Sequence, residues 1–194
     1  MARPKSFDKQ RVLQAAALLF WQQGYEATSM RHLTDATGLT AGSLYNEFGS
    51  KLQLFEAALN AYIDFVILAR IGQYFTESED PLSAIRGFIV SSFKNVPAEV
   101  KGNACLLINT AAELGQSEAI VAKTLKRGFG AIERGLLEQL NRAKELEQVA
   151  PDLDCVQSAR QLMFLTSGLL VASRTQSNSR QLEETVDFTL RAFA

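Results

Sequence analysis

The sequence is short of the residues that several classes of protein require. It holds two cysteines, Cys105 and Cys155, among 194 residues, and a single histidine, His32. Two cysteines are too few for a disulfide scaffold, and a reducing cytosol keeps such cysteines as thiols. A histidine-based metal site or a catalytic triad could be built only around His32. We therefore expect no metal and no cofactor.

Long hydrophobic runs are also missing. The longest apolar stretch, residues 162–173, is shorter than the roughly 20 residues that cross a bilayer. The start of the chain, residues 1–6, lacks the apolar core that a secretory signal needs. These two absences predict a cytoplasmic protein without a membrane partner.

Strand patterns are absent as well, whereas apolar residues recur at helical spacing almost throughout. Capping residues, proline or glycine interrupt this spacing at several places, which predicts an all-α fold of about nine helices. The first 51 residues carry six basic and four acidic side chains, and the remainder carries fourteen and seventeen. A basic head on an acidic body is typical of a polyanion-binding module joined to another domain. We expect domains at 1–50 and 51–194.

The informative stretch is residues 28–48, where two short helices meet at Gly38. Thr28 and Thr40 are good N-cap residues, and two helices that begin after them form a helix-turn-helix. Five apolar side chains should pack these helices against the first one: Leu33, Ala36, Leu39, Leu44 and Phe48. The second helix would expose a small and polar set that fits a major groove about 12 Å wide: Thr40, Ala41, Ser43, Tyr45 and Asn46. On this pattern alone, an ordinary helical corner with a solvated polar face is the alternative.

The same residues resemble the DNA-binding domain of TetR-type repressors. The resemblance is carried by Gly24-Tyr25-x-x-Thr28 and by Gly38-Leu39-Thr40-x-Gly42-Ser43-Leu44-Tyr45-x-x-Phe48-x-Ser50-Lys51. It implies a homodimeric transcriptional repressor, not an enzyme, that a small-molecule inducer releases from a palindromic operator in double-stranded DNA.

The resemblance also implies roles for single residues. The helix after Thr40 would lie in the major groove, so that Thr40, Ala41, Ser43 and Asn46 face base edges. Tyr45 would reach a phosphate, and Thr28 and Lys51 would hold flanking phosphates at helix N-termini. Arg31 completes the expected DNA-binding set.

The sequence departs from many relatives at Ala41, where a lysine is common, and Glu47 adds a negative charge nearby. Hydrogen bonds to base edges should therefore be few. Contacts with thymine methyl groups, water-mediated readout, and Arg3 or Lys5 in a minor groove would contribute instead. A merely solubilising basic tail is the alternative for these two residues.

One body segment, residues 102–114, is similar to the Gly-Cys-Leu-x-x-Asn-x-x-x-Glu stretch of one branch of these repressors, with Ala104 in place of the glycine. Cys105, Asn109 and Glu113 are four apart and share a helix face. Such polar groups need partners if buried, and a regulatory pocket would supply them. The expected ligand-binding residues are Tyr62, Phe65, Phe88, Cys105, Asn109, Phe129, Met163 and Phe164. Plain core packing is the alternative for each.

Cys105 suggests further alternatives, because a cysteine near a helix N-terminus can react with electrophiles or oxidants. Some relatives with this cysteine sense such compounds, so the resemblance allows a redox-sensing or electrophile-sensing repressor. A buried cysteine that only fills space is the simpler interpretation. The rival classes of function are a helical thiol-based enzyme and a helical adaptor that binds only protein.

The last two helices should form the dimer interface. Apolar area would come from Leu162, Leu165, Leu169 and Leu170, and close approach from Ser167, Gly168 and Ala172. A second stripe consists of Leu182, Val186, Leu190 and Phe193. The resemblance implies a four-helix bundle across a two-fold axis. The alternative is that both stripes face their own core.

Overall fold

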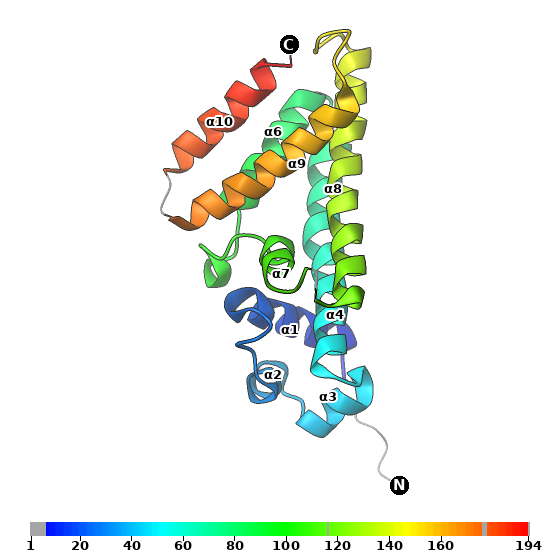
Figure 1. Ribbon diagram of the computed structural model, residues 1–194, viewed down its shortest axis with the longest axis vertical. Coiled ribbons are helices and arrows are strands. Elements are labelled where there is room, and N and C mark those ends of the chain that lie inside the picture. The colour runs from blue at the N-terminus through cyan, green and yellow to red at the C-terminus, as the bar shows by residue number, and fades with distance from the viewer. Residues whose placement is uncertain (1–6, 116, 176–177, 194) are drawn as a thin grey trace.

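A computed structural model describes residues 7–115, 117–175 and 178–193. These residues form helices, turns and connecting segments, and no strand occurs among them. Figure 1 shows an elongated molecule, with the first three helices at one end and the last helix near the other. The predicted all-α fold, with an N-terminal helix-turn-helix domain and a helical body, is confirmed.

The head consists of the first three helices: α1 (Lys9–Gln23), α2 (Met30–Thr37) and α3 (Ala41–Phe48). Val12, Ala16 and Phe20 of α1 are buried, as helical spacing predicts. In the helix-turn-helix, Leu33, Leu44 and Phe48 are buried and Leu39 is partly buried, whereas Ala36 is exposed, contrary to expectation.

The start of α2 differs from the prediction. Ser29, not Thr28, is the N-cap, and its hydroxyl accepts a hydrogen bond from the His32 N–H at 3.2 Å. The His32 Nδ1 accepts in return from the Ser29 N–H at 3.3 Å, so the only histidine completes a capping box. Thr28 is fully buried, and its hydroxyl donates to the Gly24 carbonyl at 2.6 Å.

A single long helix joins head and body. It runs through α4 (Lys51–Tyr62), η1 (Ile63–Leu68), α5 (Ala69–Ile71) and η2 (Gly72–Thr76), where η1 and η2 are π-helical. Ser50 caps it, because its hydroxyl accepts a hydrogen bond from the Gln53 N–H. By length and composition this helix could cross a membrane, a test that core helices of soluble proteins also pass. Here it packs against α1, α7 and α8.

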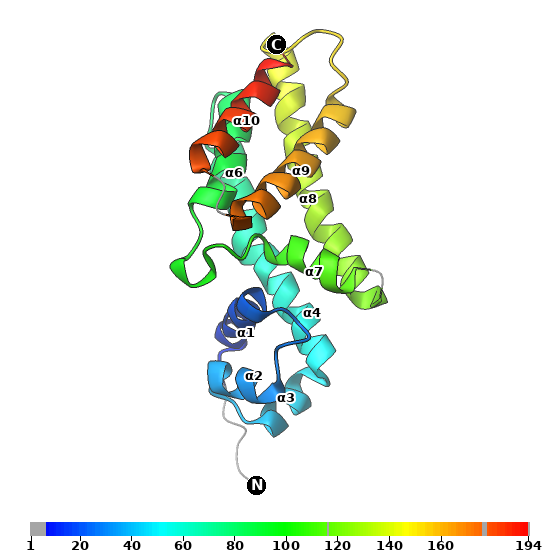
Figure 2. The ribbon, with the colours of Figure 1, turned by 60° about the vertical axis from the view of Figure 1, so that its left-hand side comes forward.

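The body is completed by five longer helices and two short turns: α6 (Pro81–Lys94), η3 (Ala98–Val100), α7 (Leu106–Leu114), α8 (Ala119–Glu145), α9 (Cys155–Ala172), η4 (Ser173–Thr175) and α10 (Ser179–Arg191). If residues 51–76 count as one helix, the described part of the chain holds nine helices of at least eight residues. Figure 2 shows α7 between the head and the upper body.

The predicted dimer stripes need correction. Leu162, Leu169 and Leu170 of α9 are buried within the protomer. The same holds for all four residues of the second stripe: Leu182, Val186, Leu190 and Phe193. These side chains therefore build the core of their own protomer. The exposed large apolar side chains of α9 and α10 lie on other faces of the two helices and are Val156, Phe164, Val171 and Phe188.

Candidate nucleic-acid interface and its junction with the body

The outer surface of the head is made by α3. Gly38 takes the left-handed conformation, with φ of +70°, and turns the chain between α2 and α3. The Thr40 hydroxyl accepts from the Ser43 N–H at 3.2 Å and so caps α3. Because Leu44 and Phe48 point into the head, the rest of α3 faces outward.

The predicted reading residues all belong to this outward surface. Thr40, Tyr45 and Asn46 are exposed, Ala41 and Ser43 are half-buried, and the Tyr45 side chain is 46% exposed. An exposed phenol beside small side chains can approach a DNA backbone without steric obstruction. The geometry required for major-groove entry is therefore present.

The flanking cations differ in their surroundings. Arg31 is exposed on α2. The Lys51 Nζ lies 4.3 Å from the centre of the Tyr25 ring, a cation–π contact that holds the ammonium at the start of α4. Lys9 pairs with Glu47 at 2.8 Å and so offsets the negative charge next to the reading surface. The sequence pattern did not reveal this pair, because the two residues are 38 positions apart.

The predicted phosphate contact of Thr28 is not supported. Its side chain is buried, its hydroxyl is bonded to the Gly24 carbonyl, and its N–H donates to the Tyr25 carbonyl at 3.2 Å. No polar group of Thr28 is left to face a phosphate. Arg3 and Lys5, predicted for a minor groove, lie outside the described residues.

An aromatic cluster joins α1 to the body. The Trp21 indole donates a buried hydrogen bond of 2.9 Å to the Ala104 carbonyl, and its ring meets the Tyr62 ring edge to face at 5.1 Å. The Tyr62 hydroxyl lies 3.3 Å from the Cys105 sulfur. Burial, and then the neighbouring Cys105, raise the pKa of Tyr62 well above its ordinary value, so the phenol stays neutral. Cys105 is thus buried against the long helix, next to the contact between Trp21 and the body.

Glu113 makes a second connection to the head. Its carboxylate accepts from the backbone N–H groups of Tyr25 and Glu26, at 3.0 and 2.8 Å. The neighbouring Gly24 has φ of +82°, and a Cβ there would lie only 3.0 Å from a Glu113 oxygen. Glycine therefore allows both the backbone conformation and the approach of the carboxylate. A partner so far along the chain could not be identified from sequence.

Asn109 lies beside these contacts. Its Nδ2 donates to the Asn103 carbonyl at 2.6 Å, and its Oδ1 accepts from Arg174 at 3.2 Å. Asn103 in turn donates to the Gln22 carbonyl at 3.4 Å. Asn109 and Glu113 line one groove between α1 and α7, whereas Cys105 does not line it and contacts Tyr62 instead.

The backbone explains the departure at Ala104. This alanine has φ of +52°, a left-handed conformation that glycine adopts without steric cost. The glycine found in similar sequences fits this conformation, and alanine takes it under some strain.

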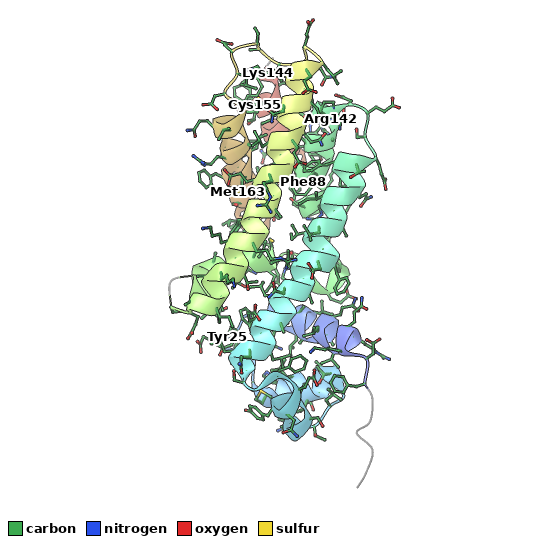
Figure 3. All side chains as sticks on the ribbon, turned by 90° about the vertical axis from the view of Figure 1, so that its right-hand side faces the viewer. Tyr25, Phe88, Arg142, Lys144, Cys155 and Met163 are labelled. Atoms are coloured by element: carbon green, nitrogen blue, oxygen red, sulfur yellow. The ribbon has the colours of Figure 1, made fainter. Side chains whose placement is uncertain are left out.

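The other predicted ligand-binding residues are dispersed. Phe88 is buried in the core, with its ring 4.8 Å from that of Phe75, whereas Phe65 and Phe164 are 43% and 62% exposed. Phe129 and Met163 are partly buried. Figure 3 shows Phe88 and Met163 in the upper body, far from Tyr25 in the head. Of the eight residues, Tyr62 and Cys105 are joined by a hydrogen bond, Phe88 is plain core, and Phe164 lies on an outer face.

Two other features bear on the chemistry of the chain. Among the described residues, no group of three or more histidine, cysteine, aspartate and glutamate side chains could hold a metal ion. A cleft of about 310 Å³ lies between α6, α9, α10 and the segment before α7, and two cations line it, Lys101 and Arg174. No local sequence pattern indicates this cleft, because its walls come from four separate segments.

Comparison with known proteins agrees with this arrangement. The family model described as bacterial regulatory proteins, tetR family, matches residues 12–58, and a tetracyclin repressor-like C-terminal domain matches residues 81–189. The chain is 32% identical over 189 residues to the HTH-type transcriptional repressor ComR of Escherichia coli (strain K12), covering 97% of this chain and 90% of that repressor. It is 25% identical over 173 residues to the HTH-type transcriptional regulator UidR of the same strain, covering 88% and 84%.

A solved structure is similar over the whole length. It is that of a cysteine variant of the TetR family transcriptional regulator CifR, complexed with 26-bp double-strand operator DNA. The TM-score is 0.85 at 25% identity, and the match covers 100% of both chains. The elongated arrangement of head and body is thus shared with that regulator.

Proposed function

Because the chain belongs to the TetR family of bacterial regulatory proteins, we propose that it is a homodimeric repressor that binds a palindromic operator through α3 of each protomer. The observation that carries this proposal is the outward surface of α3, where Thr40, Tyr45 and Asn46 are exposed above a buried Leu44. Such a regulator works in the cytoplasm, where it meets DNA. The start of α4 at Lys51 supports a division into domains at 1–50 and 51–194.

The proposed contacts follow from this surface. Ala41, Ser43 and Asn46 face the base edges, together with Thr40, and Tyr45 reaches a phosphate. Arg31 and Lys51 add positive charge on either side of α3. The CifR variant bound to operator DNA has a similar fold, which supports this mode of binding.

The dimer would form through the outer faces of α9 and α10. Phe164, Val171 and Phe188 are 62%, 50% and 69% exposed, and the space beside Gly168 is open. Apolar side chains around a glycine allow a second pair of helices to approach closely. A two-fold axis there would present two copies of α3 to one face of DNA.

The proposal is tested with the DNA fragment upstream of the protein's own gene, followed by fluorescence anisotropy. We expect tight binding that weakens steeply as salt rises, because phosphate contacts release counterions. Asn46→Ala and Tyr45→Ala should weaken binding about tenfold or more, as loss of a base or phosphate contact costs roughly 1–3 kcal/mol. Tyr45→Phe tests the hydroxyl alone.

The matched control is Asn141→Ala, which truncates an exposed asparagine on α8, away from the head. It should bind the fragment as tightly as the unchanged protein. If Asn46→Ala and Tyr45→Ala also bind normally, or if binding ignores salt, the proposed reading surface is wrong.

We further propose that an inducer in the body releases the operator by shifting the contacts between α7 and the head. A second candidate is a thiol-responsive repressor, favoured by the contact of Cys105 with Tyr62 beside Trp21. An adduct on Cys105 would force Tyr62 away from Trp21. Operator release by an alkylating agent in the unchanged protein, but not in Cys105→Ser, would support it, and release from both would exclude it.

A further inference from the structure

The cleft between α6, α9 and α10 has an unusual combination of walls. Its apolar lining comes from Phe93, Val96, Val100, Leu170 and Leu182. Lys101 and Arg174 supply its charge, and none of its described lining residues is a carboxylate. A volume of about 310 Å³ is large enough for a small organic molecule.

The two cations are not neutralised elsewhere. In the part of the chain that the structure describes, neither Lys101 nor Arg174 forms an ion pair, in contrast to Arg86 and Lys94 on the nearby α6. Within the described residues, Arg174 donates one hydrogen bond, to the neutral Asn109 side chain. Ser179, the first residue of α10, also lines the cleft, so the positive end of a 13-residue helix dipole lies at the same place. Charge and dipole both favour an anion.

We propose that this cleft binds a small organic anion with an apolar body, such as a medium-chain or aromatic carboxylate. The carboxylate lies between Lys101 and Arg174, and the apolar part packs on Val100, Leu170 and Leu182. Charge-assisted hydrogen bonds to a guanidinium are strong and directional, which selects an acid over a neutral amide of the same shape. This inference rests on the proposed function as a ligand-responsive repressor and names the ligand class.

The cleft is connected to the head by two short routes. In the first route, Arg174 donates a hydrogen bond to the Asn109 side chain, and Asn109 donates to the Asn103 carbonyl. The Asn103 side chain in turn donates to the Gln22 carbonyl of α1. An anion that binds Arg174 in place of Asn109 breaks the first hydrogen bond of this series. Ligand binding in the cleft therefore loosens the support of α1.

The second route runs through Ala104, which lines the cleft and accepts the indole hydrogen bond of Trp21. Its left-handed backbone, with φ of +52°, is a strained conformation that a small displacement can relax. Because Trp21 is the only tryptophan of the chain, its fluorescence reports directly on this contact. Ala104 therefore lines the proposed site and is also the hydrogen-bond partner of the fluorescent Trp21.

The test uses octanoate and benzoate as probes, with octanamide and benzamide as neutral counterparts. Binding is measured by titration calorimetry and by Trp21 fluorescence on the full-length protein. We expect saturable binding of at least one carboxylate and a change in the Trp21 emission. The matching amide should bind about tenfold more weakly or worse, since a hydrogen bond to a charged group is worth more than one tenfold step.

The variants are Lys101→Gln and Arg174→Gln, with Lys123→Gln as the control that removes an equal charge from an exposed position on α8. Each cleft variant should weaken carboxylate binding about tenfold, and the control should not. Thermal unfolding confirms that all three fold. If neither carboxylate binds, if the amides bind equally well, or if Arg174→Gln leaves the affinity unchanged, the proposal is overturned.

A separate measurement distinguishes this failure from failure of the proposed function. Operator binding is measured for the unchanged protein and for Arg174→Gln, with and without octanoate and benzoate. If the carboxylate releases the operator from the unchanged protein but not from Arg174→Gln, both proposals are supported. Tight operator binding without carboxylate binding overturns the anion site and leaves the repressor function intact, whereas absence of operator binding overturns the repressor function.

Discussion

The head and the body hold their polar groups in different ways. In the head, Ser29 and Thr40 cap their helices through residues three positions further along, so each short helix is completed locally. In the body, Arg86 of α6 binds Asp187 of α10, which is 101 residues away. Because its caps are local, the head can move as a unit without internal change. The body, in contrast, makes its ion pairs only when distant helices are packed together.

The connection between the two regions is small by comparison. Glu113 accepts two backbone hydrogen bonds from the loop after α1, and Trp21 donates one to the body. Gln22 of α1 donates to the Glu99 carbonyl and accepts from the Asn103 side chain. Beyond these, the long helix that begins at Lys51 carries the head. A joint with few polar contacts is suited to transmit a change in the body as a tilt of the head.

The largest expected effect is a loss of packing in the body. Phe88→Ala removes a side chain that is 2% exposed, and should lower the free energy of unfolding by about 3–5 kcal/mol. Phe65→Ala, on the half-exposed side of the long helix, is the matched control and should cost much less. Urea unfolding measures both. Equal losses would mean that the body core is not centred on α6.

The second effect concerns the outer face of the body. Phe188→Glu places a charge on the proposed dimer interface and should weaken dimerisation by about 2 kcal/mol or more, as expected for a central aromatic contact. Leu146→Glu, on a side chain that is 55% exposed just after α8, is the control. Analytical ultracentrifugation gives the mass of each variant. A dimeric Phe188→Glu would place the interface elsewhere.

The same contrast explains how much could be predicted from the sequence. The head was predictable because its signals are local: Gly38, the Thr40 cap, and the alternation of Leu44 with exposed polar residues all lie within a few positions. The one capping error, Thr28 for Ser29, arose because both hydroxyl residues can cap, and burial of Thr28 decided between them.

The body was predictable only in outline. Periodicity identified the apolar stripes of α9 and α10, but could not tell whether Leu169 faced its own core or a second protomer, because both are apolar surroundings. Phe164 and Phe88 looked alike in sequence and differ in the structure, one exposed and one buried. Pairing between distant segments, such as Glu113 with the loop after α1, has no local signal.

A smaller effect is expected at the joint. Glu113→Gln keeps the shape but loses the charge and one of two acceptors, and should weaken the support of the Tyr25 and Glu26 amides by about 1–2 kcal/mol. Hydrogen exchange of these two amides should accelerate accordingly. Glu138→Gln, an exposed residue of α8 without a partner in the described structure, is the control. Unchanged exchange would mean that the carboxylate does not hold the loop.

The smallest effect should be that of pH on stability. A change of pH should affect the body and the head differently. The hydrogen bond from Arg86 holds the pKa of Asp187 below its usual value, and the hydrogen bond from Lys94 does the same for Glu183. A depressed folded-state pKa contributes stability that is present above the unfolded-state value, about 4, and is lost as the pH falls through the folded-state value. The pairs are exposed to solvent, which screens them, so their contribution to stability is small.

Acidification should therefore loosen α10 before it affects α3, because Glu183 and Asp187 both pair with cations of α6. The N-cap of α3 is the Thr40 hydroxyl, which does not titrate, and the ion pair of α3 in the described structure is the exposed one between Lys9 and Glu47. Hydrogen exchange measured from pH 6 down to pH 4, corrected for its intrinsic pH dependence, should show the protection of α10 beginning to decline, with that of α3 unchanged. Asp187→Asn should have a lower protection at pH 6 and a flatter dependence, since the titrating partner of Arg86 is gone. A parallel decline of α3 and α10 in both proteins would contradict the separation, because it would show that head and body lose structure together.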